Sequence, residues 1–155
     1  MLLGTEIRNE ADALRVTKRG VPTANYVKFA SMVSLRSDAV APATTMRRRL
    51  EQLERMKTRR QKAVARSKAR AQVAAEKPTI PVLNEAESEK AVRYARIVAE
   101  ATLLFGNRDS ALKWLNTPRD FLHEDKDVTP MVLAETDSGA RLVESMMKRT
   151  AYGML

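Results

Sequence analysis

The feature that most constrains the fold is a run from Met46 to Glu76 that contains neither glycine nor proline. The run consists mainly of Arg, Lys, Ala, Gln and Glu, which are strong helix formers. A continuous helix of about thirty residues would be about 45 Å long, at about 1.5 Å per residue. Its apolar side thins after Leu53, so little burial would stabilise its distal part. The sequence therefore predicts a long, largely exposed helix.

The same region carries the whole excess of positive charge. Residues 43–77 hold 12 basic and 3 acidic side chains, and their net charge of +9 equals the formal net charge of the 155-residue chain. A field concentrated in this way can neutralise several phosphates along a track and makes binding steeply salt-dependent. The other interpretation is a solvated linker whose charges repel one another. Charge alone leaves both interpretations open.

Composition excludes several classes of site and favours helical packing. The absence of cysteine excludes a disulfide scaffold, a thiolate zinc site and a cysteine nucleophile. Aromatic residues make up only 5% of the chain, which favours an all-α fold over a β-sandwich. No stretch approaches the ~18–20 apolar residues of a membrane span. We therefore expect a soluble, cytoplasmic protein that is not an enzyme and has no cofactor, bound metal or membrane contact.

Turn and linker signals divide the chain into residues 1–53, 54–82 and 83–155. In the first range, Thr23 is the expected cap of a helix that ends at Leu35, and a short helical turn is expected near residues 37–40. A basic helix then starts near Thr44 or Thr45. This order of elements is compatible with a helix-turn-helix, whose later helix presents its first residues to DNA. The candidate DNA-binding residues are Thr44, Thr45, Arg47, Arg48 and Arg49. An ordinary three-helix core with a basic face is the alternative.

The second and third ranges are a basic helix with a proline-containing linker and a compact helical domain. The prolines between residues 77 and 81 predict extended chain. Caps and stops then predict helices that begin at Asn84, at Asn107 or Asp109, at Thr129, and at Asp137 or Ser138. Gly106 is the expected stop of the first of these helices. The expected buried side chains, which recur at helical spacing, are Val92, Ala95, Ile97, Val98, Ala101, Leu104, Phe105, Ala140, Leu142, Val143, Met146, Met147 and Ala151.

Three further features of the sequence bear on possible chemistry. Trp114 is expected in the core, with its indole N–H bonded to a carbonyl. Glu124, Asp125 and Asp127 lack the spacing and the glycine of a calcium loop, so a solvated acidic loop or a patch for a basic partner is the better interpretation. His123 has no activated nucleophile or phosphate-binding loop near it in sequence, which favours a surface histidine.

The C-terminal range carries an ordered set of motifs. They are Leu83-Asn84-x-x-Glu87-Ser88, Arg93-x-Ala95-Arg96, Leu104-Phe105-Gly106, Ala111-x-x-Trp114-Leu115, Pro118-x-x-x-Leu122, Pro130, Thr136-Asp137-x-Gly139-x-x-x-Val143 and Arg149-x-x-Tyr152-Gly153. In this order they resemble the toxin-binding domain of the Xre–MbcA–ParS antitoxins over residues 83–155. Thr44-x-x-Arg47-Arg48 is similar to a run found in the helix-turn-helix region of that family.

The resemblance implies a function in a type II toxin–antitoxin system. The implied partner is a RES-domain toxin that consumes NAD, bound in a hetero-oligomer that includes a homodimer of this chain. The implied toxin-binding residues are Arg149, Tyr152, Gly153, Met154 and Leu155. The implied N-terminal function is binding to operator DNA, which would repress the chain's own operon.

A second hypothesis does not depend on a toxin. In it, the chain is a stand-alone basic nucleic-acid-binding protein, and the C-terminal helices serve only for dimerisation. The two hypotheses differ in what removal of the last four residues would do. The first predicts loss of toxin inhibition with DNA binding intact, and the second predicts no effect.

Overall fold

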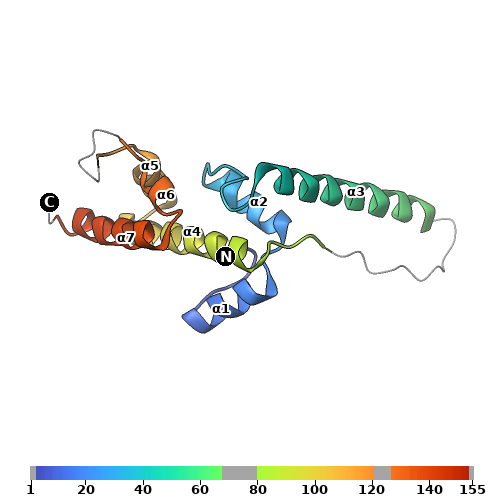
Figure 1. Ribbon diagram of the computed structural model, residues 1–155, viewed down its shortest axis with the longest axis horizontal. Coiled ribbons are helices and arrows are strands. Elements are labelled where there is room, and N and C mark those ends of the chain that lie inside the picture. The colour runs from blue at the N-terminus through green and yellow to red at the C-terminus, as the bar shows by residue number, and fades with distance from the viewer. Residues whose placement is uncertain (1–2, 68–79, 121–126, 154–155) are drawn as a thin grey trace.

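The computed structural model describes residues 3–67, 80–120 and 127–153 (Figure 1). These residues form helices without a named β-strand, which confirms the predicted all-α class. Among them, no helix combines the length and apolar character needed to cross a lipid bilayer. The helices are α1 (Glu10–Arg19), α2 (Thr23–Met32), α3 (Ala43–Ser67), α4 (Glu85–Phe105), α5 (Arg108–Asn116), α6 (Pro130–Leu133) and α7 (Asp137–Ala151).

The helix predicted from Thr23 exists, but its boundaries differ from the prediction. Pro22 occupies the N-cap position without a side-chain hydrogen bond, and Thr23 is the first helical residue. The predicted cap at Thr23 is therefore wrong, because the Pro22 carbonyl already accepts the Tyr26 N–H at 3.1 Å and the helical bonding starts one residue earlier. α2 ends at Met32 rather than Leu35. Ser34 then has a φ of 57°, in the left-handed region of backbone conformation, where the helix cannot continue.

The connection from α2 to α3 spans residues 33–42 and contains turns rather than the expected short helix. Arg36 pairs with Asp38 within this connection, at 2.7 Å between Nη2 and Oδ2. The turn of a helix-turn-helix is about three to four residues long. The connection between α2 and α3 is longer than such a turn, so its length does not support a helix-turn-helix. The helix-turn-helix stays a prediction.

α3 confirms the long basic helix as far as the described residues reach. It begins at Ala43, directly after Pro42, so Thr44 and Thr45 lie in its first turn and the predicted cap at either residue is wrong. It continues to Ser67, and the rest of the predicted helix and most of the proline linker lie outside the described residues. In Figure 1, α3 projects beyond the other helices at its distal end.

Local signals correctly predict most of the C-terminal helix ends. Asn84 and Glu87 form a complete capping box at the start of α4, and Gly106 ends α4 in the left-handed conformation with φ 80°. Asn107 caps α5, and Thr129 caps α6 with Pro130 at its first position. α7 is capped by Thr136, whose side-chain oxygen accepts the Gly139 N–H at 3.0 Å. The predicted caps Asp137 and Ser138 are instead its first two helical residues.

Buried side chains from α2, α4, α5 and α7 form one core cluster. Ala95, Ile97, Val98, Ala101, Ala140, Val143 and Met147 are buried as predicted, whereas Val92, Leu104, Phe105, Leu142 and Met146 are half-buried and Ala151 is exposed. Ala91 and Tyr94 of α4 are also buried and were not predicted. The same cluster includes Leu3, near the start of the described chain, and Met147, in the last helix.

α4 and α7 run side by side in the same direction. Arg96 pairs with Glu144 at 2.8 Å, and Glu100 pairs with Lys148 at 3.2 Å. Both pairs join residues 48 positions apart in sequence, so the two helices advance together, one turn per pair. The C-terminal ends of α4 and α7 therefore lie at the same end of the fold, as Figure 1 shows.

Candidate functional site

The predicted toxin-binding residues lie at or beyond the end of α7. Arg149 is in the last turn, exposed, and has no ion-pair partner among the residues that the structure describes. Tyr152 caps α7 through its backbone N–H, which donates to the Lys148 carbonyl at 3.0 Å, while its side chain is 69% exposed. Gly153 follows with φ 66°. Met154 and Leu155 lie outside the described residues.

An apolar side chain that the sequence analysis missed lies at the same end. Leu103 of α4 is 84% exposed, the largest exposed fraction among the described large apolar side chains. The spacing of the α4–α7 ion pairs brings the turn that contains Leu103 level with the turn that ends at Tyr152. Leu103 and Tyr152 thus expose two large side chains at the same end of the fold, and exposed apolar surface of this kind is used by protein interfaces. Leu103 lies outside the buried stripe of α4, and periodicity flags only the buried stripe.

The corner between α4 and α5 is held by aromatic packing. The rings of Phe105 and Trp114 lie 5.5 Å apart, and the Arg119 guanidinium lies 5.3 Å from the centre of the Trp114 ring. Trp114 is buried, as predicted. Its indole N–H has no hydrogen-bond partner in the described structure, so the predicted bond to a carbonyl is wrong. The contacts that position the Trp114 ring are therefore those with Phe105 and Arg119, and not a hydrogen bond from its N–H.

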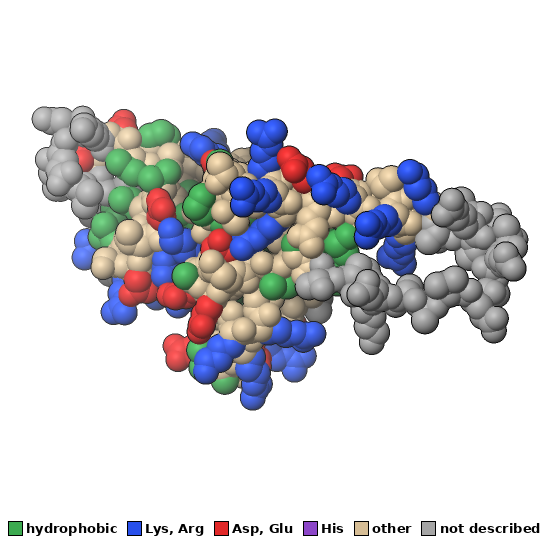
Figure 2. Space-filling model, turned by 45° about the vertical axis from the view of Figure 1, so that its right-hand side comes forward, with side chains coloured by type: hydrophobic (Ala, Val, Ile, Leu, Met, Phe, Trp, Pro, Cys, Tyr) green, Lys and Arg blue, Asp and Glu red, His purple; other side chains and the backbone are tan. Residues whose placement is uncertain are grey.

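The second candidate surface is the basic side of α3. Thr44, Arg47 and Arg48 are exposed near its start, and Thr45 is half-buried. The exposed basic residues farther along are Arg55, Lys57, Arg59, Arg60 and Lys62. Figure 2 shows their side chains spread along the projecting helix, with few acidic ones between them. Two of the charges are offset on the helix itself, because Arg47 pairs with Glu51 and Lys57 with Glu54.

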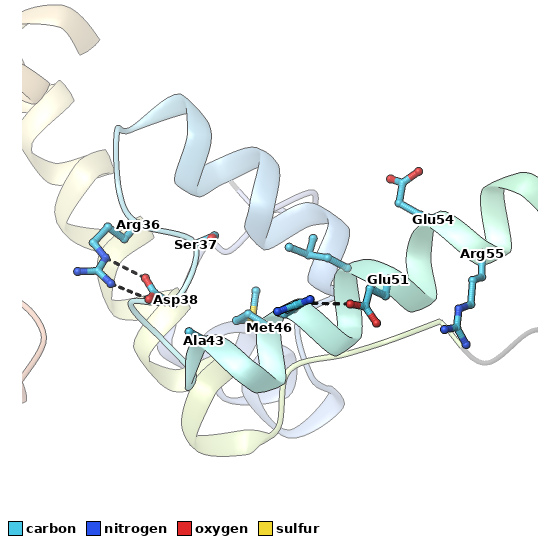
Figure 3. Close-up of a pocket in the computed structure, with 10 residues that line it drawn as sticks. Arg36, Ser37, Asp38, Ala43, Met46, Glu51, Glu54 and Arg55 are labelled. Atoms are coloured by element: carbon cyan, nitrogen blue, oxygen red, sulfur yellow. Dashed lines mark hydrogen bonds and ion pairs between the residues drawn. The ribbon is translucent and has the colours of Figure 1, made fainter.

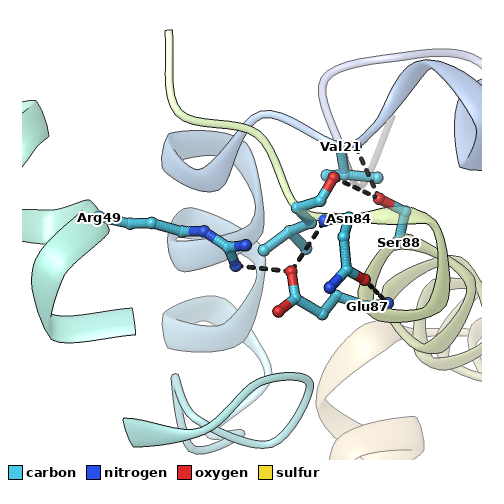
Figure 4. Close-up of polar contacts among 6 residues, drawn as sticks. Val21, Arg49, Asn84, Glu87 and Ser88 are labelled. Carbon is cyan, nitrogen blue, oxygen red and sulfur yellow. Dashed lines mark hydrogen bonds and ion pairs between the residues drawn. The ribbon is translucent and has the colours of Figure 1, made fainter. Parts of the chain in front are cut away.

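Arg49 does not join this surface. Its guanidinium reaches Glu87 of α4, with 2.6 Å between Nη1 and Oε2, and the two side chains are only 17% and 9% exposed (Figure 4). Water screens the attraction in a nearly buried pair less than in an exposed one, and loss of either partner would leave an unpaired, poorly hydrated charge. The structure therefore separates Arg49 from Arg47 and Arg48, its neighbours in the predicted DNA-binding set.

A shallow groove of about 750 Å³ lies between α3 and the turn before it (Figure 3). Met46 and Leu50 line it with apolar surface, and charged side chains of both signs surround them. At one end, a hydrogen bond from Arg36 lowers the pKa of the Asp38 carboxyl. The mixed charge gives this groove no preference for an anion, so it adds no phosphate site to α3.

A second groove, of about 660 Å³, lies between α1 and α4. Leu14 and Val92 provide apolar surface from the two helices, and Glu10 and Glu85 stand at its rim. Both carboxylates are the first residues of their helices, where the helix dipole favours negative charge. The predicted acidic loop, with Glu124 and Asp125, and His123 lie outside the described residues.

Comparison with known proteins identifies the C-terminal part of the chain. Residues 100–153 match the family described as the antitoxin Xre/MbcA/ParS C-terminal toxin-binding domain. A 67-residue stretch is 34% identical to a protein named Antitoxin Xre from Pseudomonas putida strain KT2440. That stretch covers 43% of this chain and 40% of the relative.

The matched range agrees with the structure. It begins in the second half of α4 and takes in α5, α6 and α7, so it contains Leu103, Arg149 and Tyr152 at their common end. It starts later than the resemblance read from the sequence, which begins at residue 83. The description of the matched family names binding to a toxin as the function of this domain. Residues 100–153 of this chain are thus similar to the toxin-binding domain of the Xre/MbcA/ParS antitoxins.

Proposed function

We propose that this chain is the antitoxin of a type II toxin–antitoxin system, and that it binds and inhibits a RES-domain toxin that degrades NAD. The observation that carries the proposal is the match of residues 100–153 to a toxin-binding domain. In this proposal the chain works in the cytoplasm, within a hetero-oligomer built on its homodimer. The contact with the toxin is made by the common end of α4 and α7.

The chemistry of this end supports the contact. Leu103 and Tyr152 offer two large, exposed side chains, and tyrosine is enriched among the residues that dominate protein interfaces. Arg149 adds a positive charge that no described residue neutralises. Gly153 adds no side chain next to Tyr152, so it leaves the tyrosine ring accessible to a partner.

The test is co-expression with the neighbouring reading frame, followed by purification and an assay of NAD consumption. We expect a partner to co-purify and its NAD consumption to be suppressed by this chain. Removal of residues 152–155, or Tyr152→Ala, should weaken the complex by about tenfold or more, as for other aromatic anchors. Arg149→Ala should weaken it, whereas Arg141→Ala, at the opposite end of the same helix, should not. Full inhibition by the truncated chain would contradict the proposed contact.

We further propose that α3 binds DNA and represses the operon. Support comes from the seven exposed basic residues of α3 at positions 47–62 and from its projection away from the other helices. Phosphate contacts of this kind release counterions, so the affinity should fall steeply with salt, by a slope of about 0.9 per phosphate neutralised. Affinity for duplex DNA that stays flat between low and physiological salt would contradict this proposal.

The stand-alone nucleic-acid-binding protein is the alternative. It is favoured if no partner co-purifies and no NAD consumption exists to suppress, while the DNA affinity remains strong and salt-dependent. The same preparation tests both functions.

A further inference from the structure

A nearly buried ion pair joins the basic helix α3 to the start of α4. We infer that Arg49 is a positioning residue: its pair with Glu87 sets the direction in which α3 leaves the fold and so aims the basic surface. The pair would also link α3 mechanically to α4, the helix that leads into the toxin-binding domain. The positioning of α3 is inferred from the contacts of Arg49 and Glu87. Its effect on DNA binding rests on the function proposed above for α3.

Glu87 is a fixed anchor because its own helix holds it. Its Oε2 accepts the Asn84 N–H at 2.8 Å, and the Asn84 side chain accepts the Glu87 N–H at 2.9 Å. The carboxylate that receives Arg49 is therefore part of the capping box of α4 (Figure 4). With 9% of its side chain exposed, Glu87 has little freedom to move to another partner.

The segment before α4 is held on the opposite side by α2 and the turn before it. The Leu83 N–H donates to the Val21 carbonyl at 2.8 Å, and the Thr23 N–H donates to the Pro81 carbonyl at 2.9 Å. Ser88, next to Glu87, accepts the Val21 N–H at 3.0 Å. The start of α4 is thus tied to the N-terminal part of the chain by backbone bonds, and it provides a rigid base for Arg49.

α3, in contrast, has few attachments. Met46 is buried, and Leu50, Leu53 and Met56 are half-buried, but every described side chain from residue 57 to residue 62 is exposed. Residue 62 lies about 20 Å along the helix from Arg49, at about 1.5 Å per residue. A tilt of about 10° at the pair would move the distal basic residues by about 3.5 Å over that length. The ion pair therefore lies where a small change has a large effect on the basic surface.

The inference separates two roles within the arginine run. Arg47 and Arg48 are exposed, and the ion pair of Arg47 with Glu51 is itself exposed, so a phosphate can compete for it. Arg49 instead faces α4 and sets the direction of the helix that carries them. Arg49 and Arg47 are therefore a matched pair for experiment, because both make an ion pair and only one of the pairs is buried.

The test uses the full chain and the absence of cysteine from its sequence. Spin labels on Gln61→Cys in α3 and Ser145→Cys in α7 report the position of α3 as a distance distribution. The chosen variant is the double substitution Arg49→Met with Glu87→Gln, because it leaves no unpaired buried charge and a glutamine can still complete the capping box. Arg49→Lys keeps a cation at the pair, and Arg47→Gln is the exposed control.

We expect the double variant to remain folded by circular dichroism but to show a broader or shifted distance distribution. Arg49→Lys and Arg47→Gln should keep the distribution of the unsubstituted chain. An unchanged distribution in the double variant would overturn the inference. If the double variant does not fold, the single variant Arg49→Met is measured in its place with the same expectation, because the unsubstituted Glu87 still accepts the Asn84 N–H in the capping box.

A second measurement separates aiming from direct contact with nucleic acid. The probe is a mixed-sequence DNA duplex, with affinity measured across a range of salt. Arg47→Gln should lower the salt slope by about 0.9, the value for one lost phosphate contact, whereas the double variant should leave the slope unchanged. A drop of the same size in the double variant would mean that Arg49 itself contacts phosphate, and would overturn the inference. If no duplex binds, the proposed DNA function fails and the distance measurement alone decides the positioning.

Discussion

Gly139, at the third position of α7, is the glycine whose replacement the structure penalises most directly. A Cβ added there would overlap the carbonyl oxygen of Leu133 and lie 2.7 Å from its carbonyl carbon. It would also lie 2.9 Å from the Thr136 hydroxyl, which accepts the Gly139 N–H and caps the helix. The atoms in the way are backbone atoms of α6 and the cap of α7, so no side-chain rotation removes the clash.

Two opposing effects decide the outcome of Gly139→Ala. Alanine in a helix is favoured over glycine by about 1 kcal/mol. Overpacking in a close-packed site costs about 1–3 kcal/mol and sometimes more, and a fixed carbonyl places this case at the upper end. We therefore expect a net loss of about 2 kcal/mol in the free energy of unfolding. For a chain of this length that loss lowers Tm by about 4–8 °C.

Thermal unfolding followed by circular dichroism measures this change. Ser138→Ala is the matched control, because Ser138 is exposed and precedes Gly139 in the same turn. We expect Ser138→Ala to unfold close to the unsubstituted chain. A Gly139→Ala variant as stable as the unsubstituted chain, or more stable, would show that helix propensity outweighs the contact with α6, and would refute the reasoning.

Two further predictions follow from burial. Met147 is fully buried and Met146 is only half-buried, so Met147→Ala should cost about 2–5 kcal/mol in urea unfolding, and Met146→Ala clearly less; equal losses would contradict the packing of α7. Burial raises the pKa of Tyr94 to about 12, from about 10 in the unfolded chain, so its neutral form stabilises the fold and that contribution is lost as pH rises from about 10 to 12. Tyr94→Phe should therefore lose less stability over this range, as measured by urea unfolding at the two ends of it.

The parts of the fold that could be predicted from sequence are those set by neighbouring residues. Asn84, Asn107 and Thr129 act within one turn of themselves, and a glycine such as Gly106 ends a helix because it reaches the left-handed region without strain. The failures at Thr23 and Thr136 are of the same kind. In both cases the N-cap lies earlier in the chain than expected: at α7 because Thr136 caps the helix, and at α2 because Pro22 holds the N-cap position without a side-chain bond.

The candidate site was less predictable. The resemblance over residues 83–155 indicated the toxin-binding domain that residues 100–153 match, but it did not indicate Leu103, because no pattern marks an exposed leucine. The role of Arg49 depends on Glu87, which lies 38 residues away in sequence and meets it only after α3 and α4 have packed. Three adjacent arginines look equivalent in sequence, and only the fold distinguishes the third from the first two.

The two ion pairs between α4 and α7 alternate in sign along each helix. α4 presents Arg96 and then Glu100, while α7 presents Glu144 and then Lys148. A slip of α7 by one turn would set Arg96 against Lys148 in one direction, or Glu100 against Glu144 in the other. Either slip brings like charges together, so the charge pattern favours one alignment of α7 along α4. A partner that binds the common C-terminal end of these helices therefore meets two helix ends whose relative position the ion pairs help to fix.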